Sequence, residues 1–71
     1  MQQKKLSEAI ALLKLNVEFY PKSWNTYDSL AEAYATNGEK DLAIANYKKS
    51  IELNPQNSGA REKLKKLEAG Q

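Results

Sequence analysis

Two carboxylates at a helical spacing are the first residues in this chain that suggest chemistry. Asp28 and Glu32 lie four residues apart, so both side chains would project from one face of a helix. A catalytic pair of carboxylates also needs a cleft and a pKa shifted by its surroundings, and an open helical surface offers little of either. The Tyr and Ser residues follow no spacing typical of a nucleophile and its base. The residue types therefore predict no catalytic site.

Composition narrows the remaining classes of function. The 71 residues contain no Cys and no His, so we expect no disulfide, no metal site and no cofactor. Lys and Arg number 11 and Asp and Glu number 9, a net charge of +2 with the two signs well mixed. A nucleic-acid-binding protein usually concentrates its basic residues in a stripe, so we expect no nucleic acid partner.

Membrane insertion and export are also not expected. The longest apolar run near the start, residues 9–13, is too short to span a bilayer and is not followed by a signal-peptide cleavage pattern. We therefore expect a cytoplasmic protein with no membrane segment, an expectation that would not hold for a fragment of a longer, exported chain.

Helices must carry the candidate residues, because apolar side chains recur at three- and four-residue steps. The first such stretch, residues 24–37, ends at Asn37-Gly38, and the second, residues 40–53, ends before Asn54-Pro55. A third helix is expected at 4–20, with an apolar stripe at Leu6, Ala9, Ile10, Leu13, Val17 and Tyr20. A fourth, at 58–69, has a thin stripe of Ala60, Leu64 and Leu67 among charged residues, and Asn57 precedes it as a capping residue.

The chain contains an internal repeat of 34 residues. Six residues of the first predicted helix and the turn after it recur unchanged 34 positions later: Ala9, Ile10, Ala11, Lys14, Glu18 and Pro21. Helix 4–20 therefore corresponds to helix 40–53, and helix 58–69 to helix 24–37.

One full period, residues 24–57, carries the spacing Tyr27, Leu30-Ala31, Tyr34, Gly38, Ala43, Tyr47 and Pro55. This pattern resembles the tetratricopeptide repeat, although Lys40 stands where the family usually has an aromatic residue. The resemblance implies an all-α fold of antiparallel helical hairpins, four helices in a fragment of a right-handed solenoid. Residues 1–71 would form one domain: 4–20 the second helix of a partial repeat, 24–57 a complete repeat, and 58–69 a polar capping helix.

The resemblance also implies a concave face lined by the first helix of each repeat. The side chains expected there are Asn25, Asp28, Ser29, Glu32, Thr36, Lys63 and Lys66. Some family members grip a carboxylate with Lys and Asn at two of these places, which here hold Asp28 and Glu32. We therefore expect a basic or neutral peptide rather than an acidic one, with an unoccupied, solvated face as the alternative.

Two function classes remain open. The first is a protein–protein interaction module that binds a peptide or protein. The second is a structural C-terminal appendage that packs on a larger parent chain, because residues 19–30 also resemble repeat tails of bacterial hydrolases related to β-lactamases and esterases.

A second apolar stripe lies on the first predicted helix. Leu12, Leu15 and Phe19 continue at helical spacing beside the main stripe, and a helix that is apolar on more than one face expects more than one neighbour. We predict that this surface is covered, either by a second copy in a two-fold homodimer or by an upstream domain of a longer chain.

Overall fold

The computed structural model describes residues 3–70, and over these residues the chain forms four α-helices and no strand. They are α1 (Gln3–Phe19), α2 (Trp24–Thr36), α3 (Lys40–Leu53) and α4 (Ser58–Glu68). The predicted all-α fold is confirmed, and the predicted helix ends differ from the observed ones by at most one residue.

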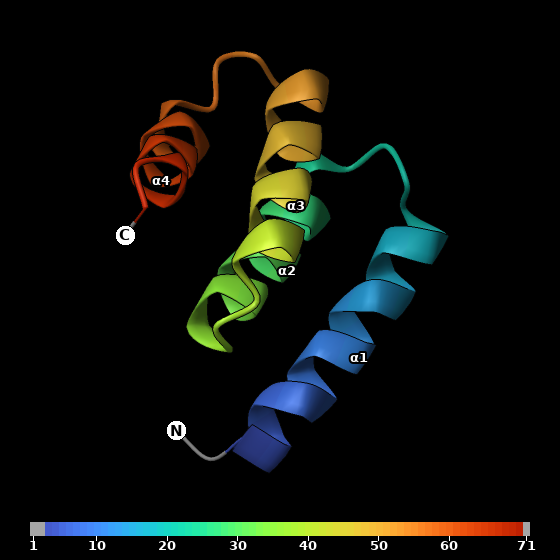
Figure 1. The fold of residues 1–71 in the computed structure, drawn as a ribbon. Coiled ribbons are helices and arrows are strands. Elements are labelled where there is room, and N and C mark those ends of the chain that lie inside the picture. The colour runs from blue at the N-terminus through green and yellow to red at the C-terminus, as the bar shows by residue number, and fades with distance from the viewer. Residues whose placement is uncertain (1–2, 71) are drawn as a thin grey trace.

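The helices form a series in which each packs on the next along the chain, α1 on α2, α2 on α3 and α3 on α4. Successive helices run in opposite directions, and in the view of Figure 1 α2 lies behind α3, with α1 and α4 on either side of this pair. The extents of the described chain are 32 × 30 × 15 Å. Helices α1 and α4 form the two ends of the series, and these ends, with the gap between α2 and α4, are the surfaces that matter for function.

Two residues fix the connections on either side of α3. Gly38 has a φ of +79°, a left-handed conformation that costs a side-chain-bearing residue strain, and it lets the Glu39 N–H donate to the Tyr34 carbonyl at 2.9 Å. Pro55 disfavours helix at Asn54, and α3 ends at Leu53. Both outcomes match the sequence prediction.

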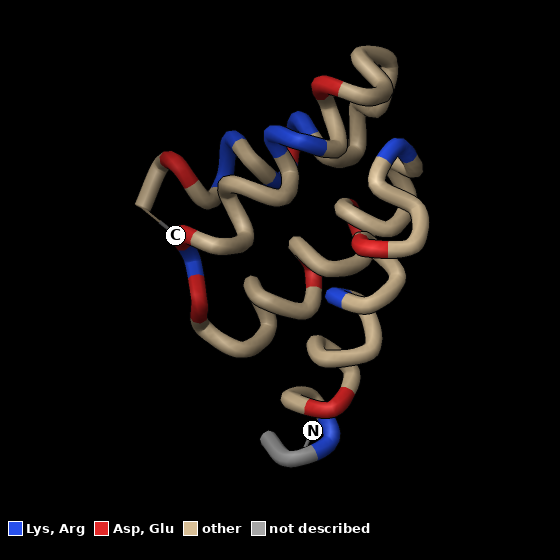
Figure 2. The backbone as a smooth tube through the Cα atoms, turned by 90° about the vertical axis from the view of Figure 1, so that its right-hand side faces the viewer, with Lys and Arg blue, Asp and Glu red and all other residues tan. Residues whose placement is uncertain are grey.

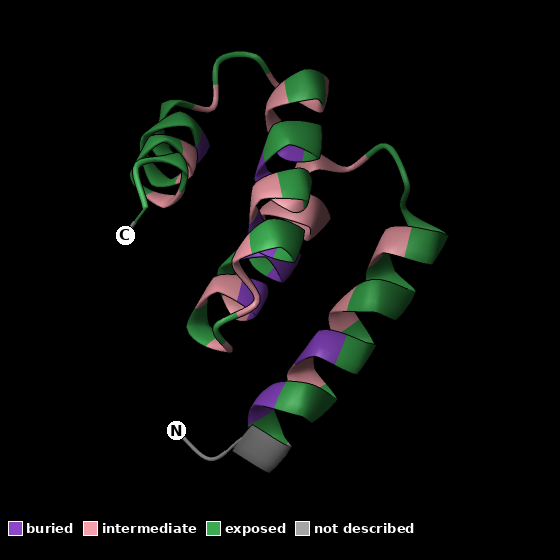
Figure 3. Ribbon diagram, in the orientation of Figure 1, coloured by how far each residue is buried: buried purple, intermediate pink, exposed green. Residues whose placement is uncertain are grey.

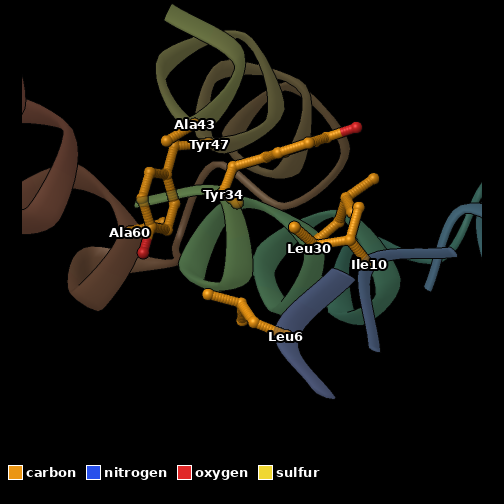
Figure 4. Close-up of a cluster of buried hydrophobic side chains, with 8 residues drawn as sticks. Leu6, Ile10, Leu30, Tyr34, Ala43, Tyr47 and Ala60 are labelled. Carbon is orange, nitrogen blue, oxygen red and sulfur yellow. The ribbon is translucent and has the colours of Figure 1, made fainter. Parts of the chain in front are cut away.

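The core is centred on the α2–α3 hairpin. Ala31 and Ala43 are completely buried, and these small residues allow the two helix backbones to approach closely. The complete set of buried apolar residues is Leu6, Ile10, Leu30, Ala31, Tyr34, Ala43, Tyr47 and Ala60. Tyr47 reaches toward Ala60 of α4, so one core connects all four helices (Figure 4).

Leu30 of α2 lies beside Ile10 of α1 (Figure 4). One expectation about the first helix was wrong. Tyr20 was expected to extend the apolar stripe of the first helix, but α1 ends at Phe19 and Tyr20 is exposed. Beyond the last helical residue the chain no longer follows the helical period, so the stripe cannot continue.

Candidate functional site

A hydrogen-bonded chain of side chains sets the position of α4 against the α2–α3 hairpin. Ser50 of α3 is fully buried and donates to the carbonyl of Trp24 at the start of α2, at 3.1 Å. Asn57 donates to the Ser50 hydroxyl at 3.1 Å and accepts from the Ala60 N–H at 3.2 Å, which caps α4. One buried hydroxyl thereby links three helices and fixes the space between α2 and α4.

A shallow hollow of about 200 Å³ lies between α2 and α4, with the side chain of Tyr47 from α3 in its lining. Its lining is completed by Ala35 of α2 and by Lys63, Lys66 and Leu67 of α4. Apolar groups therefore line the interior, and two ammonium groups belong to the α4 side. The hollow can accept an apolar side chain of a partner, with polar groups at its edge to orient the rest.

The α2 side of this face carries the acidic residues. Glu32 is exposed, and its carboxylate lies 3.6 Å from the ammonium of Lys63 across the gap to α4. Asn25, Ser29 and Thr36 are exposed on the same helix, and the Thr36 hydroxyl donates to the Glu32 carbonyl within its own turn.

Asp28, predicted on the concave face, is half-buried. Its Oδ1 atom is shielded from solvent and has no hydrogen-bond partner in residues 3–70. Burial raises the pKa of the Asp28 carboxyl, the nearby charge of Lys63 opposes that rise, and Glu32 adds to it. Burial, together with the charges of Asp28 and Glu32, raises the pKa of Tyr47 to about 12.

The structure therefore brings some predicted site residues together and leaves others apart. Glu32, Lys63 and Lys66 lie at the gap between α2 and α4, whereas Asn25, Ser29 and Thr36 are exposed along α2 and do not line the hollow. Sequence reasoning missed Ala35, Tyr47 and Leu67. Leu67 follows Lys63 by four positions, and this spacing could have indicated it.

A second surface lies on the outer side of α1. Leu12, Leu15 and Phe19 are 64%, 48% and 73% exposed, while Leu6 and Ile10 of the same helix are buried. The buried segments of α1 lie on the side of the helix toward α2 and α3 (Figure 3). The helix thus has an apolar face with a neighbour and an apolar face without one among residues 3–70.

Asp and Glu are the only charged residues of α2, whereas Lys and Arg outnumber Asp and Glu on α4 (Figure 2). Within the described residues, no three acidic side chains come together as a metal site would require. No helix over residues 3–70 has both the length and the apolar content needed to cross a bilayer.

Comparison with known proteins agrees with this architecture. The sequence model of the tetratricopeptide repeat matches residues 25–57. Over 50 residues, 70% of this chain, the sequence is 38% identical to Superkiller complex protein 3 of Homo sapiens, and the matched stretch spans 3% of that protein. Helices α2 and α3, with Gly38 between them and Pro55 after them, coincide with the matched repeat. Residues 25–57 are therefore a tetratricopeptide repeat.

Proposed function

We propose that this protein is an interaction module that binds an extended peptide segment of a partner on the face between α2 and α4. A tetratricopeptide repeat is a protein–protein interaction element in general, and the hollow at Tyr47 is the observation that supports this particular face. An apolar side chain of the partner enters the hollow, and the neighbouring residues of the partner lie along α2. The protein binds its partner and performs no catalysis.

The charges on this face favour a neutral or basic partner along α2. Lys63 pairs with Glu32 across the gap at 3.6 Å, and Asp28 is a half-buried carboxyl whose pKa burial raises. The charge along α2 is therefore weakly acidic, and carboxylates of a partner would be repelled there. Lys66, on the α4 side of the hollow, can accept an acidic residue at the other edge.

Selection from a displayed library of random peptides would test this face. We expect the selected sequences to share an apolar residue with neutral or basic neighbours, and to lose affinity for a Glu32→Lys variant. Glu18→Lys is the matched control, because Glu18 is exposed on α1 and lies outside the hollow. Peptides that bind both variants equally well would place the binding site elsewhere, and acidic peptides that bind most tightly would reverse the charge assignment.

The organisation of the chain that supports this function is a complete repeat, 24–57, with one helix on each side. In this proposal α1 is the second helix of a partial repeat, and α4 is a polar capping helix. The exposed residues Arg61, Lys65 and Glu68 support the capping role, because α4 carries them at places where α2 has Tyr27, Ala31 and Tyr34.

Self-association through α1 is a second mode of interaction that we propose. Leu12, Leu15 and Phe19 support it, since leaving three large apolar side chains in water forgoes about 1.5–3 kcal/mol for each. In a longer parent chain, an upstream domain would cover the same face, and the protein would then serve as a structural appendage.

A further inference from the structure

The two ends of the helical series, α1 and α4, can be compared directly. The 34-residue repeat relates α1 to α3 and α4 to α2. If the chain self-associates, as proposed above, two arrangements of the copies can be distinguished. In a head-to-tail contact, α4 of one copy packs on α1 of the next, and copies can be added without limit. In a head-to-head contact, α1 packs on α1, and the assembly stops at two copies.

The α4 end carries charged groups, and two of them already have partners. Both Nε and Nη2 of Arg61 donate to the Pro55 carbonyl, at 3.0 and 2.6 Å. Glu68 lies 3.6 Å from the ammonium of Lys48 on α3. A hollow of about 290 Å³ lies between α3 and α4, and its lining consists of Lys48, Ile51, Arg61, Leu64, Lys65 and Glu68. A helix entering this hollow would have to displace these interactions.

The α1 end has the opposite chemistry. Leu12 and Leu15 occupy the places that Asn46 and Lys49 hold on α3, where Lys49 is exposed and bonded to Glu52 at 2.9 Å. The α1 sequence from Ala9 to Val17 contains one charged residue, Lys14, and its step of two from Leu12 puts it on a different side of the helix.

A head-to-tail contact would therefore bury charge. If α1 of one copy packed on α4 of another as α3 packs on α2, Lys65 would take the place of Ala31, which is completely buried. An ammonium group enclosed there without a partner would be strongly unfavourable. Of the two contacts between copies, the one between two α1 helices covers the apolar face of α1 without enclosing this ammonium group.

We propose that two copies associate head to head, with their α1 helices packed antiparallel about a two-fold axis near the middle of α1. The spacing of Leu12, Leu15 and Phe19 alternates steps of three and four, as in the seam of a helix pair. Leu12 of one copy faces Leu15 of the other. Phe19 then comes level with Glu8 of the other copy.

This arrangement has a defined assembly state. Each copy uses its apolar end once, and the polar α4 helices form the two outer ends. The result is a closed dimer, and the face between α2 and α4 stays open in both copies.

Disulfide trapping tests the geometry, because the chain has no Cys of its own. Copies carrying Leu12→Cys are mixed with copies carrying Leu15→Cys, and the cross-linked heterodimer is expected to form in high yield under mild oxidation. Copies carrying Leu15→Cys mixed with copies carrying Arg61→Cys probe the head-to-tail contact, because the equivalent residues, Lys49 and Tyr27, lie on helices α3 and α2, which pack on each other within one chain. A higher yield from the second mixture would overturn the head-to-head arrangement.

Sedimentation of the intact chain separates this inference from the peptide-binding proposal. We expect a dimer for wild type and for Leu42→Glu, an exposed position on α3, and loss of the dimer for the double variant Leu12→Glu, Leu15→Lys. Circular dichroism confirms that each variant is helical. A wild type that stays monomeric at high micromolar concentration would overturn the inference and the proposed self-association together. Retained peptide binding by that monomer would leave the function of the α2–α4 face standing.

Discussion

Leu30 shows how much one side chain contributes to so small a core. It is 4% exposed and lies between α2 and α1, where Leu6 and Ile10 are also buried. A core in a domain of this length rarely supplies more than about 3–5 kcal/mol of stability. Removing a single well-packed side chain therefore removes a large part of the free energy of unfolding.

We predict that Leu30→Ala lowers the free energy of unfolding by about 2–5 kcal/mol, because it removes buried apolar atoms and leaves a cavity. Chemical denaturation followed by circular dichroism would measure this. Leu42→Ala is the control: Leu42 is 44% exposed, and its truncation should change stability far less. Equal effects of the two substitutions would show that Leu30 is not a core residue.

Asp28 makes the stability of the protein depend on pH. Burial raises its pKa in the folded state above the usual value of 3.8, so the folded chain binds this proton more tightly than the unfolded chain. Asp28 therefore destabilises the fold at neutral pH, and this effect is relieved as the pH falls through the raised pKa toward 3.8.

We predict that Asp28→Asn is more stable than wild type at neutral pH, and that the difference shrinks as the solution is acidified toward pH 3.8. The reason is that Asn keeps the size of the side chain without the charge that burial disfavours. Thermal melts at a series of pH values would record the difference. Glu62→Gln, which removes a carboxylate from the exposed face of α4, is the matched control. A less stable Asp28→Asn at pH 7 would mean that attraction to Lys63 outweighs burial.

The start of α4 shows that similar capping residues can differ in their contribution to a helix. Asn57 and Ser23 are both at the N-cap position of a helix, α4 and α2 respectively. The Asn57 side chain accepts from Ala60 and donates to buried Ser50, whereas the Ser23 side chain makes no capping bond within the described chain. At α2, the carbonyl of Ser23 instead accepts from the Thr26 hydroxyl at 2.8 Å.

Substituting each residue by Ala should therefore give unequal results. We predict that Asn57→Ala costs about 0.5–2 kcal/mol, the usual range for the loss of a capping side chain, and that it loosens α4 first. Ser23→Ala should change the free energy of unfolding only slightly. Urea denaturation would give both values, and hydrogen exchange would locate the loosening. If Ser23→Ala proved the more costly, the Asn57 and Ser50 contacts would not be what positions α4.

At the scale of the whole molecule, the charged residues of α4 keep the repeat from continuing. Within α2, Ala31 and Tyr34 accept α3, and the places equivalent to them in α4 hold Lys65 and Glu68. A polar end of this kind is how repeat proteins end a stack of helices without exposing an apolar surface.

We predict that Lys65→Ala combined with Glu68→Tyr makes the chain associate beyond a dimer. These changes give α4 the residues with which α2 binds α3, so α4 as well as α1 can then bind another copy. A chain that binds other copies at both ends does not stop at a dimer. Sedimentation velocity should show species that grow with concentration, while Lys63→Ala, on a different face of α4, should behave as wild type. If the double variant sediments as wild type does, features of α4 other than Lys65 and Glu68 prevent further association.

The sequence by itself determined the helices and the connections between them. Apolar spacing, Gly38 and Pro55 act within a few residues, so the four elements and their ends followed from local preferences. The 34-residue repeat and the spacing from Tyr27 to Pro55 were sufficient to indicate the family. The exposure of Leu12, Leu15 and Phe19 was predictable because they continue a second apolar stripe on one helix.

Only the tertiary structure decided how surfaces from different helices combine. The helical period puts Asp28 and Glu32 on one side of α2, but the position of α4 decides that Glu32 meets Lys63 while Asp28 becomes half-buried. Likewise, Leu30 faces α1, and Ala35 meets Leu67 across a hollow, because of the separation and crossing of helices. Those quantities depend on side-chain packing between segments distant in sequence, such as Tyr47 on Ala60 and Ser50 with Trp24 and Asn57, and local preferences do not specify them.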